Sequence, residues 1–410
     1  MNIVLINHYA GYPELGMEFR PYYLAKFWVK RGHNVTIIAS SYSHLRRKQP
    51  RCKKLIQVQE LDGIKYVWVK NPKYSGNGVM RTINIFSFVF ITWLFYKKIL
   101  NTPVDLVISS STYPLDIYPA KKIANKNNAK LIFEPHDLWP SVLYLVGGMS
   151  RYNPFVVLMQ IAEDASCKYA DAVISLHPDN ILHLKTRGCD ERNYFHIPNG
   201  VDVSAWSEFG NLPATHQQLI DRIKKENKYI LMYVGSVALA NGLDTLVSAA
   251  KTLQEMNKDI CVLIVGDGPL RKQLKAYADK NELHNVYFLE KVNKEVVPTL
   301  LSYTDITYLG FVPSPLYQYG ISPNKLWDYM MASKPIIMAI NSSNDPVNEA
   351  KCGYTIQPGS DEEIVSSVLK LMEMTPNERN VLGKNGREYV LKNNDYEILA
   401  DKYITIVKNI

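Results

Sequence analysis

The chain has 410 residues, of which 47% are apolar and 21% charged, and it carries a net charge of +8. This length accommodates two or three domains with sizeable cores, and the composition excludes disordered, collagenous and coiled-coil classes. The five cysteines are scattered and form no C-x-x-C pair, so we expect neither a disulfide framework nor a zinc site, and a reducing compartment is favoured.

Positive charge gathers in the first half. Residues 1–205 hold 25 Lys and Arg against 15 Asp and Glu, whereas the remainder holds 22 against 24. Six positive side chains fall within nine residues: Arg46, Arg47, Lys48, Arg51, Lys53 and Lys54. Such a cluster is either a solvated loop or a contact for anionic lipid head groups or a diphosphate-bearing acceptor. Nucleic acid fits less well, because no interleaved aromatic platform or recognition helix accompanies the cluster.

Short runs rich in Val and Ile alternate with amphipathic stretches. The predicted strands are Asn2–Asn7, Asn34–Ala39, Ile64–Val69, Asp105–Ser109, Lys130–Glu134, Ala172–Leu176, Tyr194–Ile197, Tyr229–Gly235, Ile260–Val265, Val286–Leu289, Asp305–Leu309, Pro335–Ala339 and Tyr354–Ile356. Most are continuous apolar runs, which are typical of parallel strands buried on both faces. The predicted helices between them include Gly16–Arg31, Leu243–Met256, Leu270–Asn281 and Glu362–Met374.

This alternation occurs twice, so the sequence predicts two Rossmann-like, doubly wound α/β domains. A Pro198-Asn199-Gly200 turn and the polar stretch after it place the boundary near residue 205. Ligands of such sheets bind outside the carboxyl ends of the strands, so two facing domains are expected to enclose a central cleft.

The segment Ile83–Leu100 is strongly apolar and aromatic and ends in Lys97 and Lys98. Its apolar run is shorter than the roughly 20 residues that a spanning helix needs, so we do not expect it to cross a membrane. It is either a buried core helix or an interfacial helix lying among lipid head groups.

A helix start is predicted at Ser322-Pro323-Asn324-Lys325. Ser322 is a good N-cap and Pro323 suits the first helical position, so the free amides and Lys325 would form an anion site. Asp328 lies one turn beyond Asn324, where a carboxylate can accept hydrogen bonds from two ribose hydroxyls. The alternative is an ordinary capped helix whose Lys and Asp face water.

Two glycine-rich junctions support an anion site in the second half. Gly235-Ser236 ends one strand before Asn241-Gly242 opens a helix, and Gly266-Asp267-Gly268-Pro269 follows the next strand. Glycine at such turns lets backbone amides approach phosphates closely. Together with the Ser322 helix, these junctions predict a nucleoside diphosphate site.

Two loops of the first half follow strands at their carboxyl ends. One contains Gly16, placed to face a phosphate at a helix start, and the other is Glu134-Pro135-His136-Asp137. A lone histidine is more often structural than catalytic, but His136 precedes Asp137 on an irregular, proline-bounded loop, so we favour a functional role.

In this order, these motifs resemble the retaining glycosyltransferases of family 4, and above all the bacterial members that act in O-antigen (lipopolysaccharide), capsule or exopolysaccharide assembly. Further matching segments are Arg31-Gly32-His33-Asn34-Val35, Ile197-Pro198-Asn199-Gly200-Val201-Asp202 and Lys334-Pro335. The resemblance implies the GT-B architecture, with an acceptor-binding domain over 1–205 and a nucleotide-sugar-binding domain over 206–393. The segment 394–410 would be a helix that crosses back to the first domain.

The resemblance also implies roles for single residues. The expected catalytic residues are His136, which would contact the transferred sugar, Lys325, near the phosphates, and Asp328, which would hold the ribose. The expected donor-binding residues are Gly16, Gly235, Ser236, Asn241, Gly266, Lys291, Gly320, Ser322 and Asn324. Two positions depart from the family pattern. Gly320 replaces the first glutamate of the E-x(7)-E motif, and Asn241 replaces a basic residue whose charge Lys291 or Lys325 would supply.

The reaction implied is transfer, without a cofactor, of a sugar from a nucleotide-sugar. We expect no metal, because no acidic D-x-D pair is placed to hold one beside the phosphates. The donor would be a UDP-sugar, with an N-acetylated sugar as a candidate for the group transferred. The acceptor would be polyprenyl-diphosphate-linked or an oligosaccharide, met in the cytoplasm at the inner face of the membrane, with peripheral contact to its anionic surface. A UDP-sugar 2-epimerase on the same architecture and a non-catalytic subunit that binds nucleotide-sugar are the alternatives.

Overall fold

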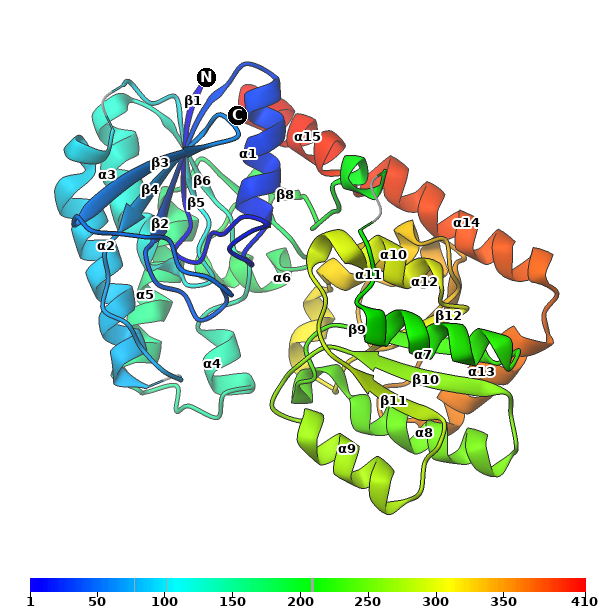
Figure 1. Cartoon of the computed structure of the whole chain (residues 1–410). Coiled ribbons are helices and arrows are strands. Elements are labelled where there is room, and N and C mark those ends of the chain that lie inside the picture. Colours follow the sequence, from blue (N-terminus) through cyan, green and yellow to red (C-terminus); the bar gives the residue numbers. More distant parts are fainter. Residues whose placement is uncertain (77, 101, 208–209) are drawn as a thin grey trace. The chain divides into compact units, whose positions relative to one another are not determined.

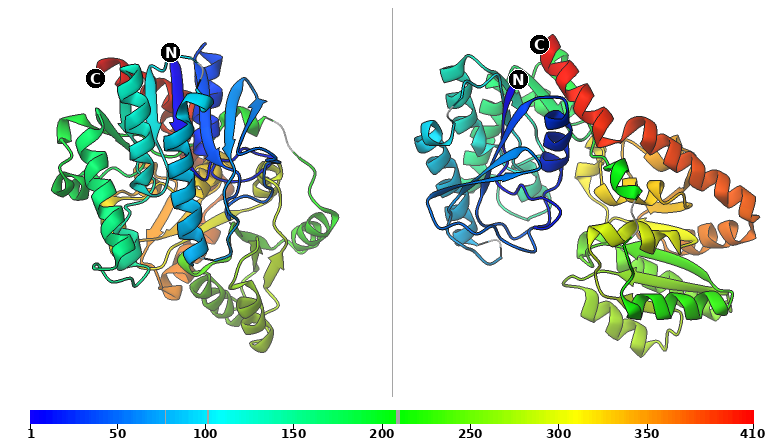
Figure 2. Two further views of the ribbon diagram at one scale, coloured as in Figure 1. Left: turned by 90° about the vertical axis from the view of Figure 1, so that its left-hand side faces the viewer. Right: turned by 45° about the horizontal axis from the view of Figure 1, so that its top comes forward.

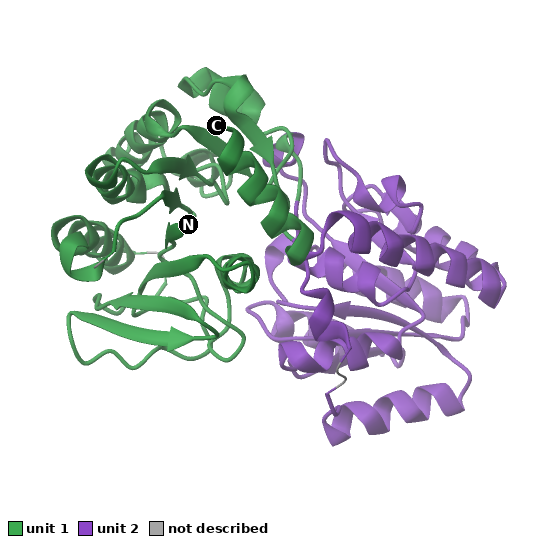
Figure 3. Cartoon of the chain, turned by 90° about the horizontal axis from the view of Figure 1, so that it is seen from above, with its two compact units in different colours: residues 1–199, 319–321, 396–410 green, residues 200–318, 322–395 purple. Residues whose placement is uncertain are grey.

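The computed structural model describes residues 1–76, 78–100, 102–207 and 210–410. The chain divides into two compact units, coloured separately in Figure 3. Unit 1 comprises residues 1–199, 319–321 and 396–410, and unit 2 comprises residues 200–318 and 322–395. The division therefore falls between Asn199 and Gly200, a few residues before the predicted boundary, and each unit is built around one sheet.

Unit 1 contains an eight-stranded sheet in the order β3-β4-β2-β1-β5-β6-β7-β8. Its strands are β1 (Asn2–Ile6), β2 (Asn34–Ser40), β3 (Ile56–Leu61), β4 (Ile64–Val69), β5 (Leu106–Ser109), β6 (Lys130–Phe133), β7 (Ala172–Ser175) and β8 (Tyr194–His196). Its helices are α1 (Arg20–Lys30), α2 (Val79–Ile99), α3 (Ile117–Asn127), α4 (Ser141–Leu145), α5 (Pro154–Tyr169), α6 (Ile181–Leu184) and α15 (Tyr396–Asn409). All described pairings are parallel except β3 with β4.

Unit 2 contains a parallel six-stranded sheet in the order β11-β10-β9-β12-β13-β14. Its strands are β9 (Tyr229–Val234), β10 (Ile260–Val265), β11 (Val286–Leu289), β12 (Ile306–Gly310), β13 (Ile336–Ala339) and β14 (Gly353–Ile356). Its helices are α7 (Ala214–Lys225), α8 (Leu243–Glu255), α9 (Arg271–Lys280), α10 (Val297–Ser302), α11 (Asn324–Met331), α12 (Pro346–Glu349), α13 (Asp361–Glu373) and α14 (Pro376–Asn393).

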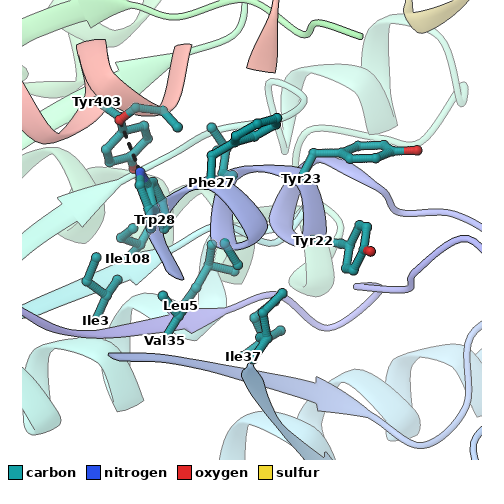
Figure 4. Close-up of a cluster of buried hydrophobic side chains, with 14 of the residues drawn as sticks. Ile3, Leu5, Tyr22, Tyr23, Phe27, Trp28, Val35, Ile37, Ile108 and Tyr403 are labelled. Carbon is teal, nitrogen blue, oxygen red and sulfur yellow. Dashed lines mark hydrogen bonds between the residues drawn. The ribbon is translucent and has the colours of Figure 1, made fainter. Parts of the chain in front are cut away.

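Helices cover both faces of the unit 1 sheet. On one face α1 and α15 enclose a core that includes Leu5, Ile37, Trp28 and Tyr403 (Figure 4). On the other face α2 and α3 pack on the alternate side chains of the same strands, such as Val4 and Ile38. This two-sided burial explains why the strands are continuous apolar runs.

The last helix, α15, is part of unit 1 although its sequence follows unit 2. It lies alongside α1 (Figure 1 and Figure 2). The Trp28 indole Nε1 donates to the Ala400 carbonyl at 3.1 Å, and the rings of Tyr23 and Tyr396 stack with centroids 5.0 Å apart. The segment expected to cross back thus completes the core of the first domain.

The helix α2 contains the apolar segment singled out in the sequence. Within the described part of the chain, it is a helix long and apolar enough to cross a membrane, as judged by length and composition. One side of it nevertheless belongs to the protein interior, because Ile85, Phe88 and Ile99 are at most 1% exposed. Its outer side carries exposed apolar side chains.

Three elements differ from the prediction. α1 begins at Arg20 rather than Gly16, since Gly16 lies in a closed loop at φ +104°. α11 begins at Asn324 with Pro323 in the N-cap position, so Ser322 does not cap it. The edge strand β3, which pairs with β4 through a hairpin at Asp62 and Gly63, was not predicted.

Candidate functional site

The unit 2 residues predicted to meet phosphates gather at the carboxyl ends of β9 and β10. Lys325, on the first turn of α11, passes its side chain over Gly235. A Cβ on Gly235 would lie 2.2 Å from the Lys325 Cε. A Cβ on Gly266 would lie only 1.8 Å from the Gly235 carbonyl oxygen. Both positions therefore require glycine for close packing, and the two junctions form one cradle.

Asn241 positions the Lys325 ammonium. The Lys325 Nζ donates to the Asn241 Oδ1 at 2.7 Å, while the Asn241 Nδ2 donates to the Ser236 carbonyl at 2.9 Å. Lys325 is half-buried, and its burial lowers its pKa to about 8. Asn241, which stands where the resemblance implies a basic residue, thus holds Lys325 in place. We call Gly235, Ser236, Asn241, Gly266 and Lys325, where the sequence predicts phosphates, the phosphate cradle.

Asp328 lies on the buried side of α11, one turn after Asn324, and is 8% exposed. Its Oδ2 accepts a hydrogen bond from the Lys294 Nζ. Its Oδ1 is buried and has no hydrogen-bond partner within the described residues. A buried carboxylate oxygen without a donor costs free energy, so this atom suits a ligand that brings hydroxyl groups.

The remaining unit 2 predictions lie around this group. Asn324 is the first residue of α11, and Ser322 is buried just before it. Lys291 is exposed in the loop after β11. Lys294, which the sequence analysis missed, is the lysine of this loop that reaches Asp328. No local pattern indicated this pair, because it joins residues 34 apart in the sequence.

In unit 1, His136 belongs to a buried polar network. Its Nε2 lies 3.2 Å from the Glu134 Oε1 and 3.0 Å from the Ser110 Oγ, which itself donates to that carboxylate oxygen at 2.7 Å. Arg20 donates to the other oxygen, Glu134 Oε2, from Nε at 3.2 Å and from a terminal nitrogen at 3.0 Å. Both Arg20 and Glu134 are about 1% exposed.

The contacts within this network outweigh the effect of burial on the pKa values of Glu134 and His136. Burial alone would raise the pKa of Glu134, but Arg20 and His136 outweigh it and lower this pKa to about 2. Burial would likewise lower the pKa of His136, but its hydrogen bond to the Glu134 carboxylate and the charge of Glu18 outweigh it and raise this pKa. His136 is therefore more protonated at neutral pH than a free histidine. Arg20 was not singled out, although a charge on the apolar face of a predicted helix signals a buried ion pair.

Gly16 and Gly320 both have positive φ and both belong to unit 1. The Gly16 amide is already used, since it donates to the Tyr12 carbonyl at 2.9 Å, and Gly16 is not at a helix start as we expected. Gly320 lies in the short segment Tyr319–Ile321 that the chain contributes to unit 1 from within the unit 2 sequence.

The basic cluster is not uniform. Arg46 is 5% exposed, and its guanidinium donates to the carbonyls of Ala10 at 2.9 Å and Ser40 at 2.8 Å. Arg46 therefore anchors the loop after β1. For this residue, the predicted contact with anionic lipid or a diphosphate-bearing acceptor is wrong, because its guanidinium is buried and already hydrogen-bonded. Lys48, Lys53 and the remaining members of the cluster are exposed.

Both halves of the chain match known family models. Residues 16–205 match the model described as Glycosyltransferase Family 4, and residues 217–389 match that described as Glycosyl transferases group 1. Among curated proteins, the chain is similar to the D-rhamnosyltransferase WbpZ from Pseudomonas aeruginosa (30% identity, 46% of each chain). It is also similar to the alpha-D-kanosaminyltransferase from Streptomyces kanamyceticus (24% identity, 39% of this chain and 40% of that protein). The matched segments thus span less than half of each relative.

Solved structures are similar over the whole chain. The sucrose-phosphate synthase from Thermosynechococcus elongatus has a TM-score of 0.73 at 16% identity, covering 100% of this chain and 98% of that one. HepE from Anabaena, solved with UDP and glucose, has a TM-score of 0.69 at 14% identity, covering 100% of both chains. At such identities the likeness shows the fold, and the predicted architecture of two doubly wound α/β domains is confirmed.

Proposed function

This chain belongs to glycosyltransferase family 4 and has the GT-B fold, and from that membership we propose that it moves a sugar from a nucleotide-sugar to an acceptor hydroxyl. The proposed donor is a UDP-sugar, with an N-acetylated sugar as a candidate for the group transferred. The proposed acceptor is lipid-linked or an oligosaccharide of bacterial surface polysaccharide assembly, met in the cytoplasm at the inner face of the membrane. In support, the chain is 21% identical, over 45% of its length, to the Escherichia coli protein named "Putative colanic acid biosynthesis glycosyl transferase WcaI".

The unpaired Oδ1 of Asp328, on the same helix as Lys325, is the observation that supports the proposal most strongly. A ribose would satisfy the carboxylate with its vicinal hydroxyls. The diphosphate would then extend toward the phosphate cradle, where Lys325 supplies positive charge. A single nucleoside diphosphate would therefore contact both the Asp328 carboxylate and the Lys325 ammonium of this helix.

The cradle would act on the leaving group. When the bond between sugar and diphosphate breaks, negative charge grows on the departing phosphate oxygens. A fixed ammonium and helix-end amides stabilise that charge more in the transition state than in the ground state. We propose that this positive charge replaces a metal ion and that the acceptor attacks the face from which the diphosphate leaves, with retention of configuration.

His136 would bind the transferred sugar. Its two hydrogen bonds to Ser110 and Glu134 both use Nε2, so Nδ1 is the nitrogen that we propose for the ligand. Because Glu134 raises the pKa of this imidazole, the ring favours its charged, hydrogen-bond-donating form. Such a donor suits a sugar hydroxyl.

The test is thermal unfolding with UDP, GDP, ADP or CMP, each with EDTA and with magnesium. A ligand at 100 times its Kd adds about 2.7 kcal/mol to the free energy of unfolding, which raises Tm by a few degrees. We expect UDP to stabilise the chain equally under both conditions. Lys325→Ala should weaken the binding of UDP but not of uridine. Asp328→Asn should weaken the binding of both ligands, by about 1.5–3 kcal/mol.

Lys384→Ala, at a side chain that is 76% exposed, is the matched control and should bind UDP as the wild type does. Stabilisation by UDP only with magnesium would contradict metal independence. Interconversion of UDP-sugars without an acceptor would identify an epimerase instead. Donor binding with neither reaction would identify a non-catalytic subunit.

A further inference from the structure

The exposed apolar side chains of this protein are concentrated in one region of unit 1. Of the 23 large hydrophobic side chains exposed in the described chain, 12 lie between Val79 and Ile161. That interval is about one fifth of the sequence. A clustered apolar surface of this kind marks an interaction site.

Five of these twelve form a stripe along α2. Val79, Ile83, Phe86, Phe90 and Trp93 recur every three or four residues and are 75%, 44%, 39%, 60% and 41% exposed. This spacing puts them on one side of the helix, opposite the buried Ile85, Phe88 and Ile99. The stripe extends from Val79 to Trp93 of the 21-residue helix α2, about 21 Å along the helix axis.

The neighbouring elements extend the stripe. The Phe86 and Phe155 rings lie 6.5 Å apart and join α2 to α5, which exposes Val157 (42%) and Ile161 (53%). The loop between α4 and α5 exposes Val146 (60%) and Tyr152 (91%). α4 and α5 contribute Val142, Leu143 and Leu158 to the same core cluster as Ile85 of α2. We call this surface of α2, the 145–152 loop and α5 the apolar face.

The charges around the apolar face are positive. α2, α3 and residues 138–152 contain no Asp or Glu at all. They carry Lys97 and Lys98 at the end of α2, Lys121, Lys122 and Lys126 on α3, and Arg151 in the loop. The two acidic residues of α5 are both engaged, Glu163 with His183 at 3.0 Å and Asp164 with Arg187 at 2.8 Å.

We propose that the apolar face docks unit 1 onto an anionic lipid bilayer, with α2 lying along the membrane surface. The apolar stripe would enter the boundary between head groups and acyl chains, while the lysines meet lipid phosphates. Trp93 lies below the Lys122 ammonium, which is 3.4 Å from the ring centroid. An aromatic ring beside a cation is typical of this interfacial depth.

Two features favour this orientation over a spanning helix. The inner side of α2 completes the core of unit 1, so withdrawing the helix into a bilayer would expose the sheet. In addition, α2 and α5 both begin after the carboxyl ends of strands, at the sheet edge where the His136 loop lies. Docking would thus place the beginnings of both helices, and the nearby carboxyl ends of the strands, beside the bilayer. The docking itself does not depend on the proposed function. Only the inference that it brings the His136 loop near a lipid-linked acceptor rests on that function.

The test is flotation of the full chain with vesicles of phosphatidylcholine, with or without phosphatidylglycerol. We expect the wild type to float with the anionic vesicles. Phe90→Glu combined with Val157→Glu should weaken this partitioning at least about tenfold, because charge is placed in the apolar stripe. Lys97→Glu combined with Lys98→Glu should remove the preference for phosphatidylglycerol.

The matched control is Leu239→Glu combined with Val381→Glu, two exposed sites of unit 2 (69% and 57%), which should float as the wild type does. All variants should keep the wild-type Tm and UDP binding. A wild type that stays with the soluble fraction, or a Phe90/Val157 variant that floats normally, would overturn the proposal. The proposal would also be overturned if the wild type were a dimer that only the Phe90/Val157 variant dissociates, because the apolar face would then be a subunit interface. Normal flotation without transfer to any acceptor would leave docking intact and contradict the proposed function.

Discussion

Two buried carboxylates of this protein differ in how fully their oxygens are paired. Glu134 has both oxygens satisfied, Oε2 by Arg20 and Oε1 by Ser110 and His136. Asp328 keeps one oxygen without a partner in the described chain. Complete pairing makes Glu134 a fixed support for His136, whereas the free oxygen of Asp328 costs about 1–3 kcal/mol that a hydroxyl-bearing ligand would recover.

Lys325 predicts a pH dependence of donor binding. Its pKa of about 8 means that it is charged below that pH and loses its charge as the pH rises through it. UDP affinity should therefore fall above about pH 8, where UDP keeps a constant charge because its phosphate titrates near 6. Binding near pH 8 should also take up a proton, which calorimetry in buffers of different ionisation enthalpy measures.

Lys325→Arg is the control for this prediction, because a guanidinium stays charged over the whole range. Its UDP affinity, even if weaker, should be flat with pH. An equal fall in wild type and variant would assign the titration to another group.

At the scale of elements, the sequence predicts best what is buried on both faces. The strands of both sheets were recognisable because continuous apolar runs leave few alternatives. The strand β3 was missed because its burial alternates along an exposed edge, although Asp62-Gly63 before Ile64 is a hairpin signal. The start of α1 was misplaced because Arg46, distant in sequence, holds the preceding loop.

The same distinction applies to the site. The glycine junctions and, to within one residue, the start of α11 were recognisable because their chemistry is local. The partners that complete the site were not, since Arg20 meets Glu134 across 114 residues and Lys294 meets Asp328 across 34. Pairing at such separations is decided by the tertiary fold.

The contact between the β9 and β10 ends gives a prediction at this scale. Gly266→Ala would place a Cβ against the Gly235 carbonyl oxygen, which is backbone and cannot rotate away. The two strand ends must therefore separate. A displacement of about 1 Å in a positioned group can lower a catalytic rate about 100-fold. We expect at least a tenfold weaker UDP affinity by calorimetry.

Gly78→Ala is the matched control, since a Cβ there meets nothing within 4 Å. It should bind UDP as the wild type does. If Gly266→Ala also binds normally, the junction tolerates the displacement and the cradle is less tightly constrained than proposed.

At the scale of the whole molecule, unit 1 depends on α15 for its stability. Tyr403 is fully buried against Trp28, with ring centroids 5.1 Å apart, and its hydroxyl has no hydrogen-bond partner among the described residues. Tyr403→Ala should destabilise unit 1 by about 3–5 kcal/mol, because it leaves a large cavity. Tyr403→Phe should be neutral or stabilising, because it removes only an unsatisfied hydroxyl.

Denaturant unfolding measures both variants, with UDP reporting on unit 2. The loss in Tyr403→Ala should appear in a transition that UDP does not shift. Glu397→Ala combined with Asp401→Ala, which removes exposed partners of Arg31, should cost less than about 1 kcal/mol. An equal cost for the two α15 variants would show that burial of Tyr403 is not what matters.

The position of α15 also bears on the order of folding during synthesis. Trp28 emerges from the ribosome early, yet its hydrogen-bond partner Ala400 follows 372 residues later. Unit 2 has all of its residues by Asp395, so it can close its core first, while the first unit to be translated still lacks a helix. A nascent chain would therefore expose the uncovered side of α1 through most of elongation, and this surface is where we expect a chaperone to bind.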